Sequence, residues 1–231
     1  MNLLAIETAT EACSVALLWG DALIDRSELA PRRHAELVLP MAEALLAEAG
    51  ITRKQLDVIA VGQGPGAFTG VRLAISVAQG LALALDIPVV PVSSLAALAM
   101  QAPRNDAPII AAIDARREEI YAGTFRFNPE DRVEPLGLEH VLPASDLILP
   151  QAEAWNVLGT GWGAYGDAIR ERLPSPPCWA DGERYPQACD VARLAAPLFI
   201  AGKGVAPEQA LPVYLRDKVA LTLEEQQQRP A

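Results

Sequence analysis

Cysteine and histidine, the residue types that most often build disulfide frameworks and metal sites, are scarce in this chain of 231 residues. Cys13, Cys178 and Cys189 are widely spaced and form no CxxC pair, so neither a disulfide framework nor a zinc site is expected. His34 and His140 are distant in sequence and belong to no HxxxH or HxxE pattern. The sequence therefore predicts no metal site.

The chain also lacks an excess of basic residues. It has 19 lysines and arginines against 29 aspartates and glutamates, a net charge of −10. A protein that binds nucleic acid by itself presents a basic face to the phosphates, so this balance argues against direct binding. It is compatible with a role in a complex whose other subunit supplies the basic surface.

Features of export or membrane insertion are missing as well. The first residues, MNLLAIETATEA, contain no basic region and reach an acid at Glu7, unlike a signal peptide. The longest apolar stretch, 73–85, is interrupted by Ser76 and Gln79. We therefore expect a cytoplasmic protein with no membrane partner. About half of the residues (51%) are hydrophobic, enough for a sizeable core.

The most distinctive stretch is 62–85, GQGPGAFTGVRLAISVAQGLALAL, which follows the apolar run 58–61. Its glycines do not match the known phosphate loops. A Walker A loop requires a lysine after the last glycine, where this chain has Val71 after Gly70. A dinucleotide-binding loop requires GxGxxG, and the spacing here is GxGxG. The pattern favours a tight turn from a strand into a helix over a phosphate site.

The helix predicted at 67–85 carries a small residue at every fourth position, and such a stripe lets another helix approach closely. A second helix, 34–49, is also rich in alanine. A sheet covers only one side of each helix, so we predict that both pair with equivalent helices of another molecule; packing within one chain is the alternative. The predicted interface residues are Leu37, Met41, Leu45, Gly70, Arg72, Ala74, Ala78 and Ala82.

The order of elements predicts the fold of the first half. Short connections join three strands into an antiparallel meander, and helices then alternate with strands. This β-β-β-α-β-α-β-α order is that of the ribonuclease H-like half-domain, by analogy. The strands are predicted at 2–8, 13–19, 22–29, 57–61 and 87–91, and the helices at 34–49, 67–85 and from Ser93 to about 101.

The second half repeats the opening in weaker form after a linker at 102–108. A strand at 109–114 ends in an acid, as the first strand does, and 120–127 is its hairpin partner. Further elements are predicted near 138–142, 157–161, 163–172 and 190–201. We therefore expect an α/β protein of two ribonuclease H-like or actin-like lobes, each a mixed sheet flanked by helices. The lobes are predicted at 1–103 and 104–231, with a frayed tail from about 220.

Acids at the ends of the two opening strands support an alternative function. In nucleotide-hydrolysing proteins of this fold, acids here hold Mg²⁺ or orient water, and the hairpin after Glu7 would wrap phosphates. Glu7 and Asp114 could then serve a weak actin-like ATPase or kinase; a solvated hairpin is the competing interpretation. The candidate nucleotide-facing residues are Glu7, Thr8, Thr10, Asp114, Gly159 and Gly161.

The segment GPGAFTGVRLAISVAQGLA at 64–82 closely resembles the signature of the TsaB (YeaZ) family of bacterial tRNA threonylcarbamoyladenosine biosynthesis proteins. Residues 4–17 resemble the opening of that family, which usually has Asp where this chain has Glu7. The segments IDARREEIYAGTF at 113–125 and PVYLRD at 212–217 fall in the family's order. The resemblance covers nearly the whole chain.

This resemblance implies an actin-like (ASKHA) fold and a non-catalytic scaffold. The scaffold would bind the catalytic subunit TsaD through the two helices described above, with the ATPase TsaE joining them. The complex transfers a threonylcarbamoyl group to N6 of adenosine 37 in tRNAs that read codons beginning with A. The chain would have no cofactor of its own, with ATP and Mg²⁺ only at the level of the complex. It would contact tRNA only through the complex. Independently of the resemblance, we expect a homodimer through the same helices in isolation, because a surface apolar enough for a partner pairs with itself when none is present.

Overall fold

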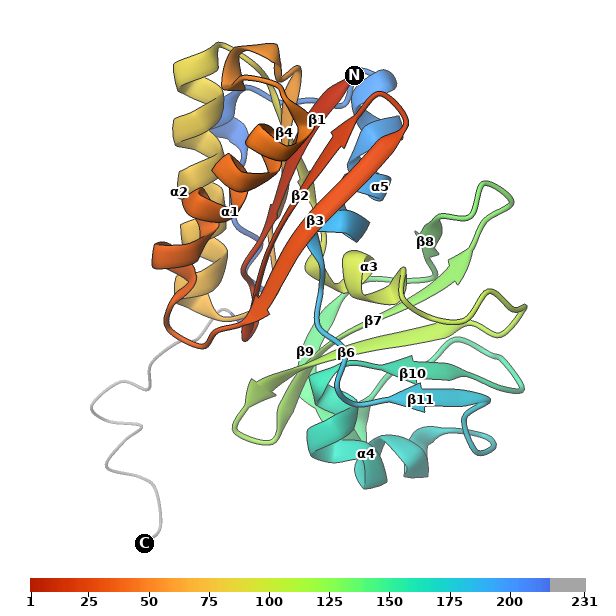
Figure 1. Cartoon of the computed structure of the whole chain (residues 1–231). Coiled ribbons are helices and arrows are strands. Elements are labelled where there is room, and N and C mark those ends of the chain that lie inside the picture. The colour runs from red at the N-terminus through yellow and green to blue at the C-terminus, as the bar shows by residue number, and fades with distance from the viewer. Residues whose placement is uncertain (217–231) are drawn as a thin grey trace, which may run out of the picture.

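The computed structural model describes residues 1–216, which form two lobes that are each built on one mixed sheet (Figure 1). The predicted fold class is confirmed. The first lobe contains β1 (Asn2–Glu7), β2 (Ala12–Trp19), β3 (Ala22–Leu29), α1 (His34–Ala49), β4 (Val58–Gly62), α2 (Phe68–Leu85), β5 (Val89–Val92) and α3 (Ser94–Ala99).

The first sheet has the order β3-β2-β1-β4-β5. β1 pairs antiparallel with β2 and parallel with β4, so that Ala5 lies between Ala16 and Ala60. The sequences of β1 and β4 are almost entirely apolar because both faces of these strands are buried, as is usual for central strands. β3 is an edge strand, and its exposed second half carries charged residues that oppose pairing with another chain.

Helices cover both faces of this sheet: α1 and α2 lie side by side on one face, and α5 (Ala188–Ile200) lies on the other (Figure 1). Alternation along the strands explains the arrangement, since neighbouring side chains point to opposite faces. On β1, Leu4 and Ile6 join the core under α2, whereas Leu3 and Ala5 join the core under α5.

The second sheet has the order β11-β10-β6-β7-β8, and β9 pairs with β7 beside β8. Its short strands β8 and β11 were not predicted from the sequence, because three-residue strands in proline-rich segments carry no readable alternation. The elements are β6 (Ile109–Arg116), β7 (Glu119–Phe127), β8 (Val133–Pro135), β9 (His140–Pro143), β10 (Asn156–Leu158), α4 (Thr160–Arg172) and β11 (Trp179–Asp181), with 3₁₀ turns at Arg53–Gln55, Ala144–Asp146 and Pro207–Gln209.

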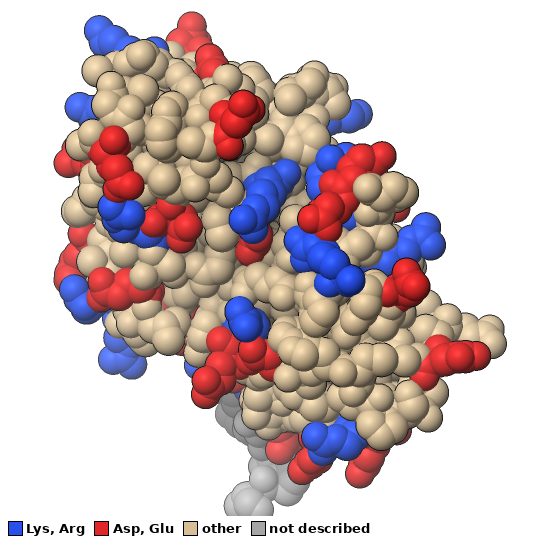
Figure 2. All heavy atoms as spheres, turned by 45° about the vertical axis from the view of Figure 1, so that its right-hand side comes forward, with Lys and Arg blue, Asp and Glu red and all other residues tan. Residues whose placement is uncertain are grey.

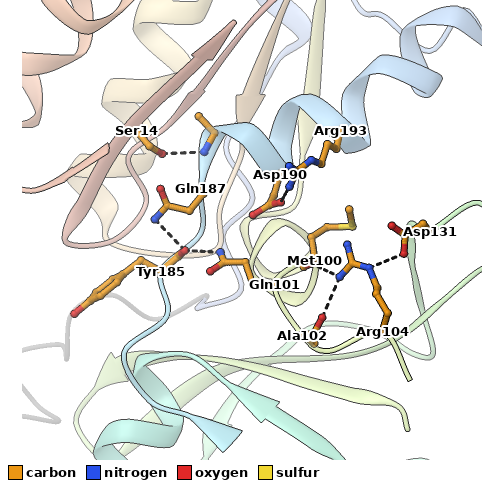
Figure 3. Close-up of polar contacts among 11 residues, drawn as sticks. Ser14, Met100, Gln101, Ala102, Arg104, Asp131, Tyr185, Gln187, Asp190 and Arg193 are labelled. Carbon is orange, nitrogen blue, oxygen red and sulfur yellow. Dashed lines mark hydrogen bonds and ion pairs between the residues drawn. The ribbon is translucent and has the colours of Figure 1, made fainter. Parts of the chain in front are cut away.

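The chain crosses between the lobes after α3 and returns before α5, and Figure 3 shows the contacts at the two crossings. The Gln101 amide donates to the Tyr185 carbonyl at 2.7 Å, which ties one crossing to the other. The backbone N–H of Ala188 then donates to Ser14 Oγ on β2 at 2.9 Å. Although α5 was predicted within the second lobe, it therefore packs on the first sheet. The predicted frayed tail lies outside the described residues.

Candidate functional site

The small-residue stripe of α2 faces the sheet of its own chain. Ala74, Ala78 and Ala82 are fully buried, and a Cβ placed on Gly70 would lie 2.0 Å from the Thr8 carbonyl oxygen. The prediction that these four residues form the partner interface is therefore wrong. The stripe lets α2 approach β1 and β4 closely, which is the alternative that the sequence left open.

The α1 residues of the predicted interface also point inward. Leu45 is fully buried, and Leu37 and Met41 are half-buried against the core between α1, α2 and the sheet. For Leu45 the interface prediction is wrong for the same reason as for the alanines. Of all the predicted interface residues, Arg72 is the one whose side chain is exposed.

The outward faces of α1 and α2 expose a different set of apolar side chains: Leu39 is 45% exposed, Phe68 48% and Leu83 73%. The Arg72 guanidinium carbon lies 3.6 Å from the centre of the Phe68 ring, and its Nε donates to the Tyr214 hydroxyl at 2.5 Å. We call this surface the helix face. Exposed aromatic, leucine and arginine side chains together are typical of protein interfaces.

Glu7 is enclosed at the end of β1. Its carboxylate accepts from the Ala9 backbone N–H at 2.6 Å and from Ser94 Oγ at 2.7 Å, and a Cβ on Gly62 would lie 2.0 Å from it. Burial raises the pKa of the Glu7 carboxyl, against the lowering effect of the Ser94 hydrogen bond. Thr8 is equally buried and donates to the Gly70 carbonyl at 2.7 Å. Both side chains are buried and bonded within the chain and neither lines the cleft between the lobes, contrary to the prediction that they face a nucleotide.

The raised pKa of Glu7 predicts a pH dependence of stability. Its contribution to the free energy of unfolding is complete below the ordinary value of 4.5 and falls as pH rises through the higher folded-state pKa. Glu7→Gln removes the charge, and its amide can accept from the Ala9 N–H and donate to Ser94 Oγ. We therefore expect its stability to fall less than that of the unchanged protein as pH rises above 4.5. Urea unfolding at several pH values measures the difference; parallel profiles would contradict this role of Glu7.

A cleft of about 360 Å³ separates the lobes beside the β1–β2 and β6–β7 hairpins, and Thr10 and Asp114 line it. Asp114 is occupied by protein contacts: its carboxylate accepts from the Arg116 backbone N–H at 2.7 Å and pairs with the Arg116 guanidinium at 2.8 Å. Arg116 also reaches Glu11 of the first lobe at 3.0 Å. Among residues 1–216, no group of three His, Cys, Asp or Glu side chains is placed to hold a metal ion.

Gly159 and Gly161 are placed for packing, not for ligand contact. A Cβ on Gly159 would lie 2.2 Å from the Ala112 carbonyl oxygen, and one on Gly161 would lie 2.9 Å from Ala112 Cβ. Gly159 also has a φ of 104°, which favours glycine. The two glycines set the close approach of α4 to β6, and neither lines the cleft.

One feature of the cleft was not predicted from the sequence. Residues 210–216, which we call the strap, run from the first lobe to the second. Val213 donates to the Gln63 carbonyl at 2.8 Å, and Arg216 donates to the Ala115 carbonyl at 3.0 Å and pairs with Glu119. The motif PVYLRD at 212–217 was the available signal, but its short apolar pattern does not reveal its neighbours.

Two mixed sheets with a cleft between them define a two-lobed α/β protein of the actin-like class. Residues 27–155 match the family model of TsaD, tRNA N6-adenosine threonylcarbamoyltransferase. The chain is 39% identical to the tRNA threonylcarbamoyladenosine biosynthesis protein TsaB of Escherichia coli (strain K12), over 95% of this chain and 96% of that protein.

The TsaB protein of Haemophilus influenzae is 35% identical, with 95% of each chain covered. A solved structure described as YeaZ from Pseudomonas aeruginosa matches with a TM-score of 0.86 and 46% identity, over 93% of this chain and 99% of that one. The chain therefore belongs to the TsaB (YeaZ) family of tRNA threonylcarbamoyladenosine biosynthesis proteins.

By length and composition α2 is apolar enough to cross a membrane, with a mean hydropathy of 1.5 over its 18 residues. Its buried stripe, however, packs against the sheet of the first lobe. The apolar residues that remain exposed belong to the helix face.

Proposed function

We propose that this chain is a non-catalytic scaffold of the complex that forms N6-threonylcarbamoyladenosine at position 37 of tRNAs reading codons that begin with A. It binds the catalytic subunit TsaD through the helix face, and the ATPase TsaE joins the pair in the cytoplasm. The observation that carries the proposal is the exposed Leu39, Phe68 and Leu83 on the two helices, in a chain of the TsaB family.

Electrostatics support an indirect contact with tRNA. The net charge is −10, and Figure 2 shows acidic and basic side chains intermixed on the side of the molecule that it presents, with no extended basic face. A partner that supplies the phosphate contacts is consistent with this distribution. In the absence of that partner, the helix face of one copy pairs with that of another.

The test of the partner surface uses two exposed leucines as a matched pair. Leu83 lies on the helix face and is 73% exposed, whereas Leu138 lies on the other lobe and is 80% exposed. Leu83→Glu is expected to lower co-purification of TsaD at least about tenfold, because it places a charge in an apolar interface, whereas Leu138→Glu leaves it unchanged. Unchanged TsaD capture by a folded Leu83→Glu variant would contradict the proposal. Sedimentation of the isolated variants tests the homodimer.

One observation favours a second candidate, a weak ATPase. The Thr10 hydroxyl, in the wall of the cleft, is buried without a hydrogen-bond partner among the described residues, as the hydroxyl of a ligand site can be. Because Glu7 is enclosed, Asp114 would act without it. Calorimetry with ATP and Mg²⁺ separates the two functions: turnover by the isolated chain that is lost in Asp114→Ala would favour the ATPase.

A further inference from the structure

A second hollow, of about 530 Å³, lies on the side where α5, α3 and β8 meet, which Figure 2 turns toward the viewer. One wall is a single face of α5, where Leu194, Pro197 and Leu198 lie at helical spacing and are followed by the C-cap residue Ala201. The opposite wall belongs to the second lobe and includes Phe125. We call this hollow the α5 groove; its volume lies within the range of ligand sites, about 300–1,000 Å³.

The carboxylate of Glu139 lies among the mostly apolar residues that line this groove, which also include Arg132 and Glu134. Glu139 is held by Ser93, whose hydroxyl donates to it while accepting the Ala96 backbone N–H at 3.1 Å as the N-cap of α3. Gly123 makes room for Glu139, since a Cβ there would lie 3.3 Å from its Cγ and 2.8 Å from the Phe125 ring. The position of the Glu139 carboxylate is therefore fixed by both lobes.

Within the described part of the chain, no cation forms an ion pair with this carboxylate. Among residues 1–216, no basic side chain lies within salt-bridge distance of Glu139, and burial raises the pKa of its carboxyl. Arg132, also in the wall of the groove, has Glu130 as its nearest acid at 3.8 Å. Glu139 is half-buried, and partial burial of a carboxylate without a cation is unfavourable, so a positively charged ligand group would gain a partly desolvated partner here.

The apolar surface is larger than one small amine would cover. Leu198 remains 39% exposed at the rim of the groove, and Pro135 on β8 is exposed opposite it. We propose that the α5 groove docks a protein segment that places a lysine or arginine side chain on Glu139 and apolar side chains on both sides of it. The groove and the helix face lie on opposite faces of the first sheet, so the two surfaces are independent.

The test titrates the isotopically labelled full chain with two peptides, acetyl-Leu-Lys-Leu-amide and acetyl-Leu-Gln-Leu-amide, and follows the backbone amides of Leu194, Leu198 and Val133 by NMR. The lysine peptide is expected to shift these amides saturably. The glutamine peptide is expected to bind about tenfold more weakly, since it lacks the charge-assisted hydrogen bond. Equal affinity of the two peptides, or no saturable shift, would overturn the proposal.

Two variants distinguish a specific contact of the peptide lysine with Glu139 from a general attraction to acidic residues. Glu139→Gln retains the shape of the side chain and is expected to weaken the lysine peptide about tenfold, without a change in melting temperature beyond a few degrees. Glu134→Gln, which removes an exposed acid at the rim, is expected to leave the affinity within about twofold. Equal losses in both variants would overturn the role of Glu139. If n-hexylammonium binds as tightly as the lysine peptide, the groove is a site for a small amine, and the proposal of a docked protein segment is overturned.

Discussion

Ala78→Glu is expected to prevent folding of the first lobe rather than only to block partner binding. Ala78 is fully buried between α2 and the sheet, where a glutamate would be an unpaired charge in an apolar core. Such burial costs about 4 kcal/mol or more, a large part of the stability of a domain. Circular dichroism and thermal melting of the purified variant measure the loss.

Ser76→Glu on the same helix is the matched control. Ser76 is exposed, so this variant is expected to keep the melting temperature of the unchanged protein within a few degrees. If Ala78→Glu folds normally and loses only its partner, the stripe faces outward in solution and the inward packing described above is wrong.

Gly70→Ala is expected to destabilise the protein by about 3 kcal/mol, because the new methyl group meets backbone rather than a movable side chain. Its Cβ would lie 2.0 Å from the Thr8 carbonyl oxygen, so α2 would have to move away from the end of β1. That movement would also stretch the hydrogen bond from the Thr8 hydroxyl to the Gly70 carbonyl. Urea unfolding at constant pH measures the change.

Gly80→Ala is the control for the backbone effect of the same substitution. Gly80 lies in the same helix and is exposed, and among residues 1–216 no atom outside the backbone of its own helix turn lies within 4 Å of the position that a new methyl group would take. Alanine is a better helix former than glycine, so a gain of about 1 kcal/mol is expected. Destabilisation by both substitutions would mean that close packing against Thr8 is not what makes Gly70 necessary.

The sequence was sufficient for most elements of the first lobe, because each carries a strong local signal. α1 begins at His34 and ends at Ala49 as predicted, with Gly50 at a φ of 68° as its cap. Ser93, where the third helix was predicted to begin, is the N-cap of α3, and its hydroxyl accepts from the Ala96 N–H. Periodicity, caps and turns depend on residues that are neighbours in the sequence, so contacts between distant segments do not change them.

The orientation of α2 could not be predicted in the same way. A helix that is apolar on nearly all sides shows no clear outward face, and alanine suits a close contact with a sheet as well as one with another helix. Likewise, Glu7 was a candidate to face a nucleotide because acids at this strand end hold Mg²⁺ or orient water in nucleotide-hydrolysing proteins of this fold, and a solvated hairpin was the alternative. The enclosure of Glu7 by Gly62 and Ser94 depends on contacts between distant segments.

The return of α5 to the first sheet has a consequence for biosynthesis. Leu3 and Ala5 of β1 share a core with Val191 and Ala195, which are separated from them by most of the chain. While the nascent chain leaves the ribosome, that face of the first sheet has no α5 to cover it until residues 188–200 have emerged. The first lobe to be synthesised is therefore completed late, and its unfinished face is the one on which a chaperone would act.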